Sequence, residues 1–280
     1  MTEELTITID NSMTRMTVGG GSCDFKLMAY SGFAAADFDV QMAAGGSSDG
    51  GYISAARLAS RTLGLQFDFG GRNAESVRQS LIGFFAPDRA LTVTARRGDI
   101  VRTIEGHASD FDITETNRYA HSVVNLSVLC PDPFFKATEA AFYSGKIVTP
   151  RFRLSCHFPC VFSVQSSSGE LAIINTGNTY ADMTAVLAAN TAAANPYILN
   201  RTNGKKIRIL GTLSAGTSLK ISTVRRGKGA WIGGTRCTID PTSQFSDFLE
   251  VGLNQLECGS DEGTDTVSAN VEYTALFLGV

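Results

Sequence analysis

The sequence predicts a mainly β protein of two domains, and three observations support this. Its 280 residues suit two domains or one large β domain. Its 28 glycines fall mostly between short β-branched or aromatic runs, a pattern typical of strands joined by tight turns. A joint at residues 142–158 separates two strand-rich halves. We therefore expect an N-terminal domain at 1–145 and a C-terminal domain at 146–280.

The first half begins with alternating strands and then loses its regular pattern. Residues 3–30 alternate in a strand-like way, with apolar side chains at every second position near the start. Residues 31–51 are mostly small, with a few apolar residues among them, and predict a flexible loop or extended arm. Residues 52–69 then predict two strands of a hairpin or meander.

One segment of the first half has the period of a helix. Asn73 is a favourable N-cap, and Pro87 marks the end. The apolar stripe expected to face the core consists of Val77, Leu81, Phe84 and Phe85. After this helix, 91–97 and 100–106 predict a hairpin across Gly98 and Asp99, followed by strands at 108–113 and 121–129.

A proline-rich segment ends the last of these strands. It reads Leu129-Cys130-Pro131-Asp132-Pro133-Phe134-Phe135. Each proline removes a backbone donor and restricts the residue before it, so the strand cannot continue. We predict that the segment is structural and that its two phenylalanines are buried against the N-terminal domain.

The second half predicts only short strands, with turns about every ten residues. The expected strands are 161–164, 171–174, 184–187, 197–199, 206–210, 219–222, 237–239, 254–258 and 267–277. This spacing favours a β-sandwich or jelly roll.

Charge excludes some classes of partner. Residues 1–150 hold 13 Lys and Arg against 17 Asp and Glu, a net −4, and residues 151–280 carry a net +1. Neither half has the basic balance of a nucleic-acid binder. The first residues lack the basic and apolar regions of a signal peptide, and no apolar run is long enough to span a bilayer. We expect a protein made in the cytoplasm that stays or assembles there.

Residues for catalysis or metal binding do not form a recognisable set. His107, His121 and His157 lack a nucleophile motif nearby. Cys156 and Cys160 flank His157, but a structural zinc site needs four ligands, and small apolar cysteines on a strand explain the pair as well. We expect the six cysteines to be reduced and mostly buried. We expect no enzyme activity, no cofactor and no metal.

The order of landmarks along the chain resembles a known family. The landmarks are Asp49–Ile53, Arg61–Phe69, Leu81–Pro87, Leu129–Phe135, Ile174–Thr179, Asn200–Ile207, Phe248–Asn254 and Val271–Val280. In this order, over nearly the whole chain, they resemble the distal tail protein (Dit) of siphophages.

The resemblance implies a fold and an assembly. The implied fold is an N-terminal β-sandwich with one α-helix and an extended arm, followed by a C-terminal galectin-like β-sandwich or jelly roll. The implied assembly is a homo-hexameric ring at the distal end of the tail tube, in the virion, formed in the host bacterial cytoplasm. One ring face would meet the tail tube protein, and the other the tail-tip hub and receptor-binding apparatus. DNA would pass through the lumen without specific binding, and no membrane insertion is implied.

Two sets of candidate binding residues follow. Phe33, Phe38, Val40 and Met42 in the arm are candidates for an oligomer interface, because apolar arm residues suit a partner's groove; packing back on the same domain is the alternative. Trp231 lies near basic residues and is a candidate for stacking on a sugar, although a hairpin with a core or edge tryptophan also explains it.

Three functions compete: a structural hub, a carbohydrate-binding tail module that recognises the host surface through the galectin-like domain, and a cell-wall hydrolase, for which no acid/base pair stands out. For the hub, we expect a chain ending near Ser144 to form rings by itself.

Overall fold

The computed structural model describes residues 4–21, 23–46, 49–71, 73–115, 121–146, 170–261 and 267–280. These residues form two compact units. The first comprises residues 1–138 together with Phe277–Val280, and the second comprises Glu139–Leu276. The expected boundary after residue 145 falls inside a strand of the second unit, and the last four residues belong to the first.

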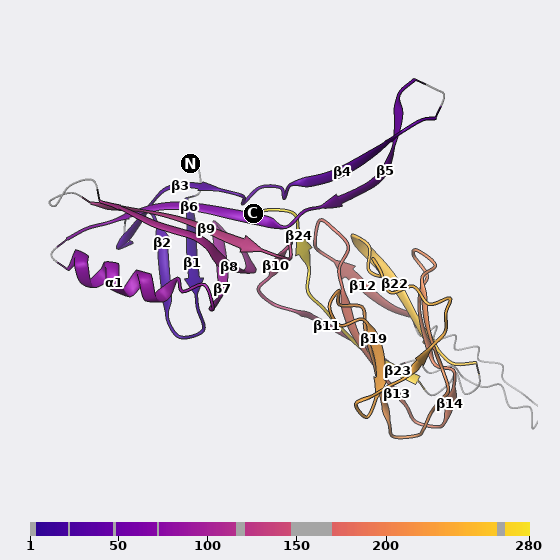
Figure 1. The fold of residues 1–280 in the computed structure, drawn as a ribbon. Helices are drawn as coiled ribbons and strands as arrows, with labels where there is room; N and C mark the ends of the chain where they lie inside the picture. Colours follow the sequence, from indigo (N-terminus) through magenta and orange to yellow (C-terminus); the bar gives the residue numbers. More distant parts are fainter. Residues whose placement is uncertain are drawn as a thin grey trace, which may run out of the picture. The chain divides into compact units, whose positions relative to one another are not determined.

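Seven strands of the first unit close into a barrel (Figure 1). In barrel order they are β8 (Ile100–Glu115), β7 (Ala90–Arg97), β1 (Leu5–Asp10), β2 (Arg15–Gly19), β3 (Phe25–Ser31), β6 (Arg61–Phe69) and β9 (Ser122–Cys130). Two short strands, β10 (Phe135–Ala137) and β24 (Leu276–Phe277), extend the sheet beyond β8. The β-sandwich expected for this domain is therefore wrong.

One long strand explains the closure. The first half of β8 pairs with β7, from Ile100 to His107, and its second half pairs with β9, from His107 to Glu115. A register shift between Ala108 and Asp110 bends the strand between these two partners. The sequence predicted two separate strands here, because the bulge interrupts the alternation.

Alternate residues of the barrel strands face one core. In β1, β6 and β7 every second side chain is buried, as the strand period requires. The helix α1 (Ala74–Phe84) adds Leu81 and Phe84 to this core, and Phe85 follows them. The predicted stripe is thus confirmed, with Val77 half-buried. Asn73 precedes the helix as predicted, but its side chain makes no capping hydrogen bond.

The proline segment behaves as predicted. β9 ends at Cys130, directly before Pro131, and Phe134 and Phe135 are 5% and 0% exposed. Phe135 begins β10 and belongs to the barrel core.

The second unit contains two larger antiparallel sheets. The first sheet comprises β11 (Ala141–Lys146), β23 (Val267–Tyr273), β13 (Met183–Ala189), β18 (Ser218–Ser222), β19 (Gly229–Ile232) and β20 (Thr235–Arg236). The second comprises β12 (Glu170–Asn175), β22 (Gly252–Gly259), β15 (Tyr197–Asn200), β16 (Lys206–Leu210) and β21 (Thr238–Ile239). A small ladder joins β14 (Ala193–Ala194) to β17 (Thr212–Leu213).

Burial alternates along strands of both sheets, as in β13 and β23 of the first and β15 and β16 of the second. One face of each sheet is therefore apolar and covered, which is typical of a sandwich. Two buried asparagines support the loops at one end: Asn200 Nδ2 donates to Phe248 O at 2.7 Å, and Asn254 Nδ2 donates to Glu250 O at 2.8 Å. The predicted strand 161–164 and the Cys156–Cys160 segment lie outside the described residues.

Candidate functional site

The arm of the first unit is a two-stranded antiparallel ribbon (Figure 1). β4 (Phe38–Ala44) pairs with β5 (Gly51–Leu58), and the ribbon pairs with no other strand among the described residues. The sequence predicted a flexible loop or extended arm over 31–51, and the arm is confirmed, although it contains the strand β4. It also predicted two strands of a hairpin or meander within 52–69; the two strands are confirmed as β5 and β6, but β5 pairs with β4, and β6 pairs with β3 and β9. The reason is the alternation of apolar and polar residues from Phe38 to Met42, which makes β4 a partner for β5.

The register of the ribbon separates an apolar face from a more polar one. Directly opposite residues share a face, and the face changes at each step along a strand. One face carries three opposite pairs: Phe38 with Leu58, Val40 with Ala56, and Met42 with Ile53. A register shift between Gln41 and Met42 leaves Ser54 unpaired and keeps Ile53 opposite Met42.

The other face of the ribbon carries its ion pair. Arg57 Nε donates to Asp39 Oδ2 at 2.6 Å across the two strands. Gln41 and Tyr52 lie on this face as well. The arm is therefore amphipathic, with an apolar face that has no charged residue.

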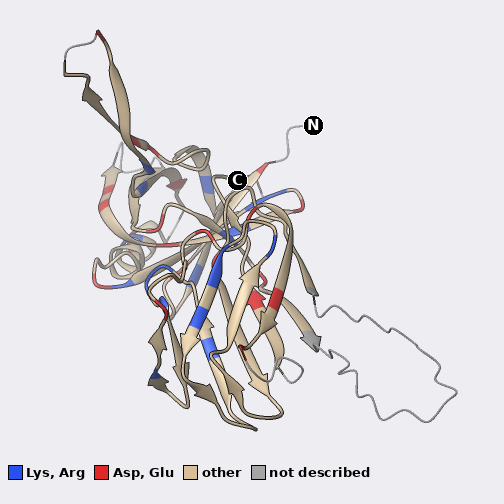
Figure 2. Ribbon diagram, turned by 90° about the vertical axis from the view of Figure 1, so that its right-hand side faces the viewer, with Lys and Arg blue, Asp and Glu red and all other residues tan. Residues whose placement is uncertain are grey.

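The apolar face is open to solvent in the single chain. Phe38, Val40, Met42 and Ile53 are 70%, 54%, 75% and 66% exposed. In Figure 2 most of the arm is tan, whereas blue Lys and Arg residues and red Asp and Glu residues are spread over the rest of the chain. Soluble monomers seldom expose a contiguous apolar strip, and an isolated two-stranded ribbon is marginally stable. The face is thus suited to burial against another protein surface.

Phe33 does not belong to this surface. It is 3% exposed, stacks on Phe135 at a centroid distance of 6.0 Å and meets the edge of Tyr30 at 5.8 Å. It therefore takes the alternative that the sequence left open, packing on its own domain. The physical reason is Gly32 before it, whose φ of +80° turns the chain inward before β4 begins.

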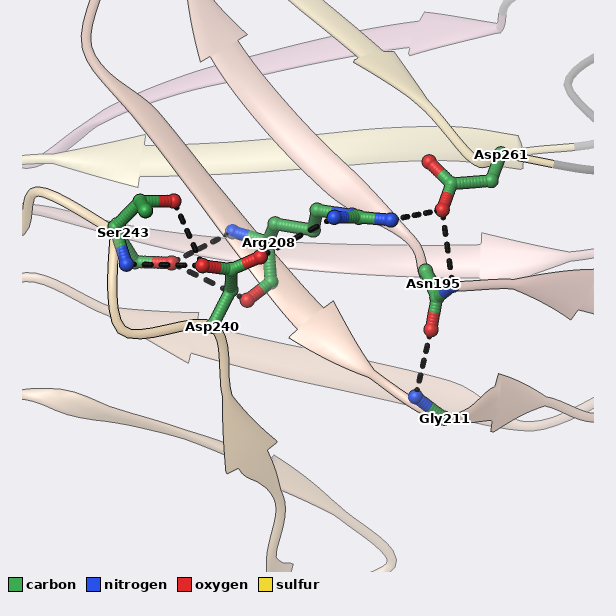
Figure 3. A network of polar contacts seen from close by, with 7 residues as sticks. Asn195, Arg208, Gly211, Asp240, Ser243 and Asp261 are labelled. Atoms are coloured by element: carbon green, nitrogen blue, oxygen red, sulfur yellow. Dashed lines mark hydrogen bonds and ion pairs between the residues drawn. The ribbon is translucent and has the colours of Figure 1, made fainter.

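A network of polar contacts lies on the second unit, and the sequence did not reveal it (Figure 3). Arg208 Nη1 donates to Asp240 Oδ2 at 3.2 Å, and Arg208 Nη2 donates to Asp261. Asn195 Nδ2 donates to Asp261 at 2.9 Å, and Asn195 Oδ1 accepts from Gly211 N at 3.0 Å. These residues are far apart in sequence and share no motif.

Hydrogen bonds shift the pKa values of this network. The Asn195 amide, followed by the Arg208 guanidinium, lowers the pKa of Asp261. Contacts from Thr242, more than Arg208, lower the pKa of Asp240. The pKa of Arg208 is raised, first by its hydrogen bond to Asp261. The charges are mutually compensated, so the network braces the ends of β16, β21 and β22.

Trp231 is half-buried in β19, opposite Lys220 of β18 and Arg236 of β20. Its ring lies close to Gly229, where an added Cβ would contact the indole. The basic residues near it in sequence are spread apart: Lys228 Nζ donates to Ser246 Oγ at 2.8 Å. The structure therefore gives Trp231 a cationic residue on the neighbouring strand to each side.

The titratable residues form no catalytic constellation in the described part of the chain. His121 Nδ1 lies 3.5 Å from Asp68 Oδ2, and His107 Nδ1 lies 3.4 Å from Pro87 O. Burial raises the pKa of the Cys130 thiol to about 11 and that of Cys258 to about 12, so neither is a thiolate near neutral pH. His157 lies outside the described residues.

The described ranges contain neither a cluster of metal ligands nor a helix that could span a membrane. Residues 4–146 and 170–280, with their gaps, contain no group of three or more His, Cys, Asp or Glu arranged to hold a metal ion. Within the same ranges, α1 is the one helix, and no helix has the length and apolarity needed to cross a membrane.

This architecture is similar to that of siphophage tail proteins. Residues 176–277 match the family described as "Siphovirus-type tail component, C-terminal domain". The crystal structure of the SPP1 Dit protein, described as a paradigm of hub adsorption apparatus in phages that infect Gram-positive bacteria, is similar over 97% of this chain and 99% of that one. The TM-score is 0.67 at 13% sequence identity.

A chain of the phage P2 baseplate in its activated conformation with calcium aligns over 98% of both chains, with a TM-score of 0.43 and 8% identity. No curated protein sequence matches this one. Residues 176–277 are therefore similar to the siphovirus-type tail component family, and the whole chain has a Dit-like fold. The resemblance drawn from the order of landmarks is confirmed.

Proposed function

We propose that this chain is the structural hub of a siphophage tail tip. Six copies form a ring at the distal end of the tail tube, in the virion. One ring face binds the tail tube protein, and the other binds the tail-tip hub and the receptor-binding apparatus. The role is architectural rather than enzymatic, and the second unit is a galectin-like sandwich.

The amphipathic arm is the observation that carries this proposal. Its apolar face is exposed in one chain, and a head-to-tail contact between an arm and a neighbouring copy closes into a ring when the rotation permits. Phe38, Val40 and Met42 are the proposed interface residues, with Ile53 added from the opposite strand. Phe33 is omitted because it is buried in its own unit. The family of residues 176–277 supports the tail as the location.

Changing one face of the ribbon at a time tests the proposal. Native mass spectrometry of the purified protein should show a particle of six chains, where one chain has a mass of 29.8 kDa. The double variant Phe38→Ser/Met42→Ser removes apolar surface from the interface and should yield monomers. The matched control, Gln41→Ser/Ala43→Ser, changes the opposite face of the same strand and should still form rings. A wild-type monomer, or a face variant that still assembles, would contradict the proposal.

DNA passes through the proposed ring without being held. The first 150 residues, which include the barrel and the arm, carry a net −4. Each phosphate contact by a basic residue would add salt-dependent affinity and slow the passage of DNA. Filter binding to duplex DNA at moderate salt should therefore detect no complex; sub-micromolar binding would contradict a conduit.

An alternative function for the second unit is carbohydrate binding through Trp231. The half-exposed indole with cationic neighbours on both sides favours it. Trp231 is the single tryptophan of the chain, so its fluorescence reports directly on a stacked sugar. A saturable change with soluble cell-wall glycans, lost in Trp231→Leu, would support this function; an unchanged spectrum over a glycan panel would exclude it.

A further inference from the structure

The segment Phe277–Val280 follows the whole second unit in sequence yet lies in the first unit. Arg102 holds it from one side: its guanidinium lies over the Phe277 ring at 3.7 Å, and its Nη1 donates to Gly279 O. Val280 N donates to Phe33 O at 2.8 Å. The segment is therefore fixed by backbone contacts as well as by a ring contact.

Arg61 joins this segment to the root of the arm. Its Nη2 donates to Leu278 O, and its Nη1 donates to Gly32 O and, at 2.9 Å, to Ala34 O. Its Nε donates to Pro133 O at 2.8 Å. The side chain is among the largest that are fully buried, with 2% of the residue exposed. One guanidinium thus holds three chain segments by four carbonyl groups.

The final segment and the arm root are in direct backbone contact. A Cβ added at Gly279 would collide with Ala34 O and approach Phe33 O. Only glycine permits this approach. The arm pairs with no other described strand, so these contacts, together with the Phe33–Phe135 stacking and the hydrogen bond from Ala59 N to Asp37 O at 2.9 Å, fix where residues 32–37 leave the barrel.

We propose that residues 277–280 act as a clasp that fixes the root of the arm, with Arg61 as the positioning residue. The arm's direction is thereby set by a segment made after the second unit, so the first unit is complete only when the whole chain is present. The proposal concerns the single chain and does not depend on the ring.

Limited chymotrypsin digestion of the full-length protein tests the clasp. Gly279→Val should displace the segment, and the bond after buried Phe33 should be cut about tenfold faster, which corresponds to local opening that is easier by ~1.4 kcal/mol. Cleavage after Phe142, which is 73% exposed in β11 and lies outside the arm, should change little and serves as the internal reference. Hydrogen exchange by mass spectrometry should show faster exchange in residues 32–37 and unchanged exchange in β13 and β23.

Two controls separate the clasp from a general loss of stability. Gly227→Ala places a Cβ in open space and should behave like the wild type. Val93→Ala weakens the barrel core at a side chain that makes none of the clasp contacts described above, and it should leave Phe33 protected under native conditions. If Gly279→Val does not fold, Gly279→Ala is the milder variant. Wild-type cleavage at Phe33 in a folded Gly279 variant, or equal exposure in Val93→Ala, would overturn the proposal.

Discussion

Each unit contains an arginine that gathers several chain segments, and the two sites differ in how the charge is compensated. Arg61 of the first unit is 2% exposed and binds four neutral backbone carbonyls. Arg208 of the second unit has 31% of its side chain exposed and binds two carboxylates, those of Asp240 and Asp261. In the first site each of the three guanidinium nitrogens donates to at least one backbone carbonyl, whereas in the second site two carboxylates neutralise a cation near water.

The difference is visible in the pKa values. Burial lowers the pKa of Arg61, which means that removing this side chain from water destabilises its charged form. The carboxylate contacts raise the pKa of Arg208. A buried charge that has lost its partners is costly, whereas an exposed ion pair contributes little. We therefore expect the stability of the first unit to depend strongly on Arg61, and the stability of the second unit to depend only weakly on the Arg208 network.

The largest effect is expected for Arg61→Met. The substitution leaves four carbonyl groups in the arm root, the proline segment and the final segment without their donor, and we expect the free energy of unfolding to fall by about 3–5 kcal/mol. Urea denaturation followed by far-UV circular dichroism measures it. Arg61→Lys, which keeps the charge but cannot reach all four carbonyls, should lie between Arg61→Met and the wild type. A Lys variant as stable as the wild type would show that charge alone suffices.

Phe135→Leu should have the next largest effect. The Arg61 guanidinium lies 4.8 Å from the Phe135 ring centroid, and Phe33 stacks on the same ring. Losing both ring contacts while keeping an apolar side chain should cost about 1–3 kcal/mol. A double-mutant cycle with Arg61→Met measures the coupling. Additive effects would mean that the cation and the ring are independent, and the clasp would then rest on hydrogen bonds alone.

The sequence predicted local features of the fold, such as turns and the helix, but it did not predict that the N-terminal sheet closes into a barrel. The Gly98–Asp99 hairpin, the helix and the burial of Phe134 depend on neighbouring residues, and their patterns are intact in the sequence. The barrel depends on β8 pairing with two strands in turn, and this non-local choice leaves no local signal. The arm was missed as a ribbon because alanine, glycine and serine dilute its strand propensity.

In the candidate site, too, some residues could be predicted from the sequence and others could not. Three of the four arm residues proposed from their apolar character lie exposed on the ribbon, whereas Phe33 is buried by a turn at Gly32 that composition does not reveal. Arg61 and Leu278 are 217 residues apart, so no spacing pointed to their contact. The expectation that a chain ending near Ser144 forms rings by itself stays a prediction, and such a chain would lack the segment that Arg61 and Arg102 bind.

Arg208→Gln should lower stability much less than Arg61→Met. Water can solvate Asp240 and Asp261 once the guanidinium is gone, and a surface ion pair is screened by salt. The difference between Arg208→Gln and wild type should shrink further in high salt, as measured by thermal unfolding at two ionic strengths. Arg236→Gln, at an exposed arginine of the same unit that forms no ion pair with another described residue, is the matched control. If Arg208→Gln lowered the free energy of unfolding as much as Arg61→Met, the two sites would not differ in their contribution to stability.

The smallest effect is a difference in acid sensitivity. Because the pKa values of Asp240 and Asp261 are lowered in the folded protein, their contribution is present above the unfolded carboxyl pKa, about 3.9, and is lost as the pH falls through the folded values. The hydrogen bonds of Arg61 go to carbonyls, which do not titrate, so its site should respond less in this range, and only through the nearby charge of Asp37. Trp231 fluorescence reports on the second unit, and its urea midpoint should fall between about pH 5 and pH 3. In Asp261→Asn this fall should be smaller, whereas Asp247→Asn, at a carboxylate outside the network, should leave it unchanged. Equal acid sensitivity in all three proteins would mean that the network does not contribute through its charges, and the second unit would then owe its acid response to other carboxylates.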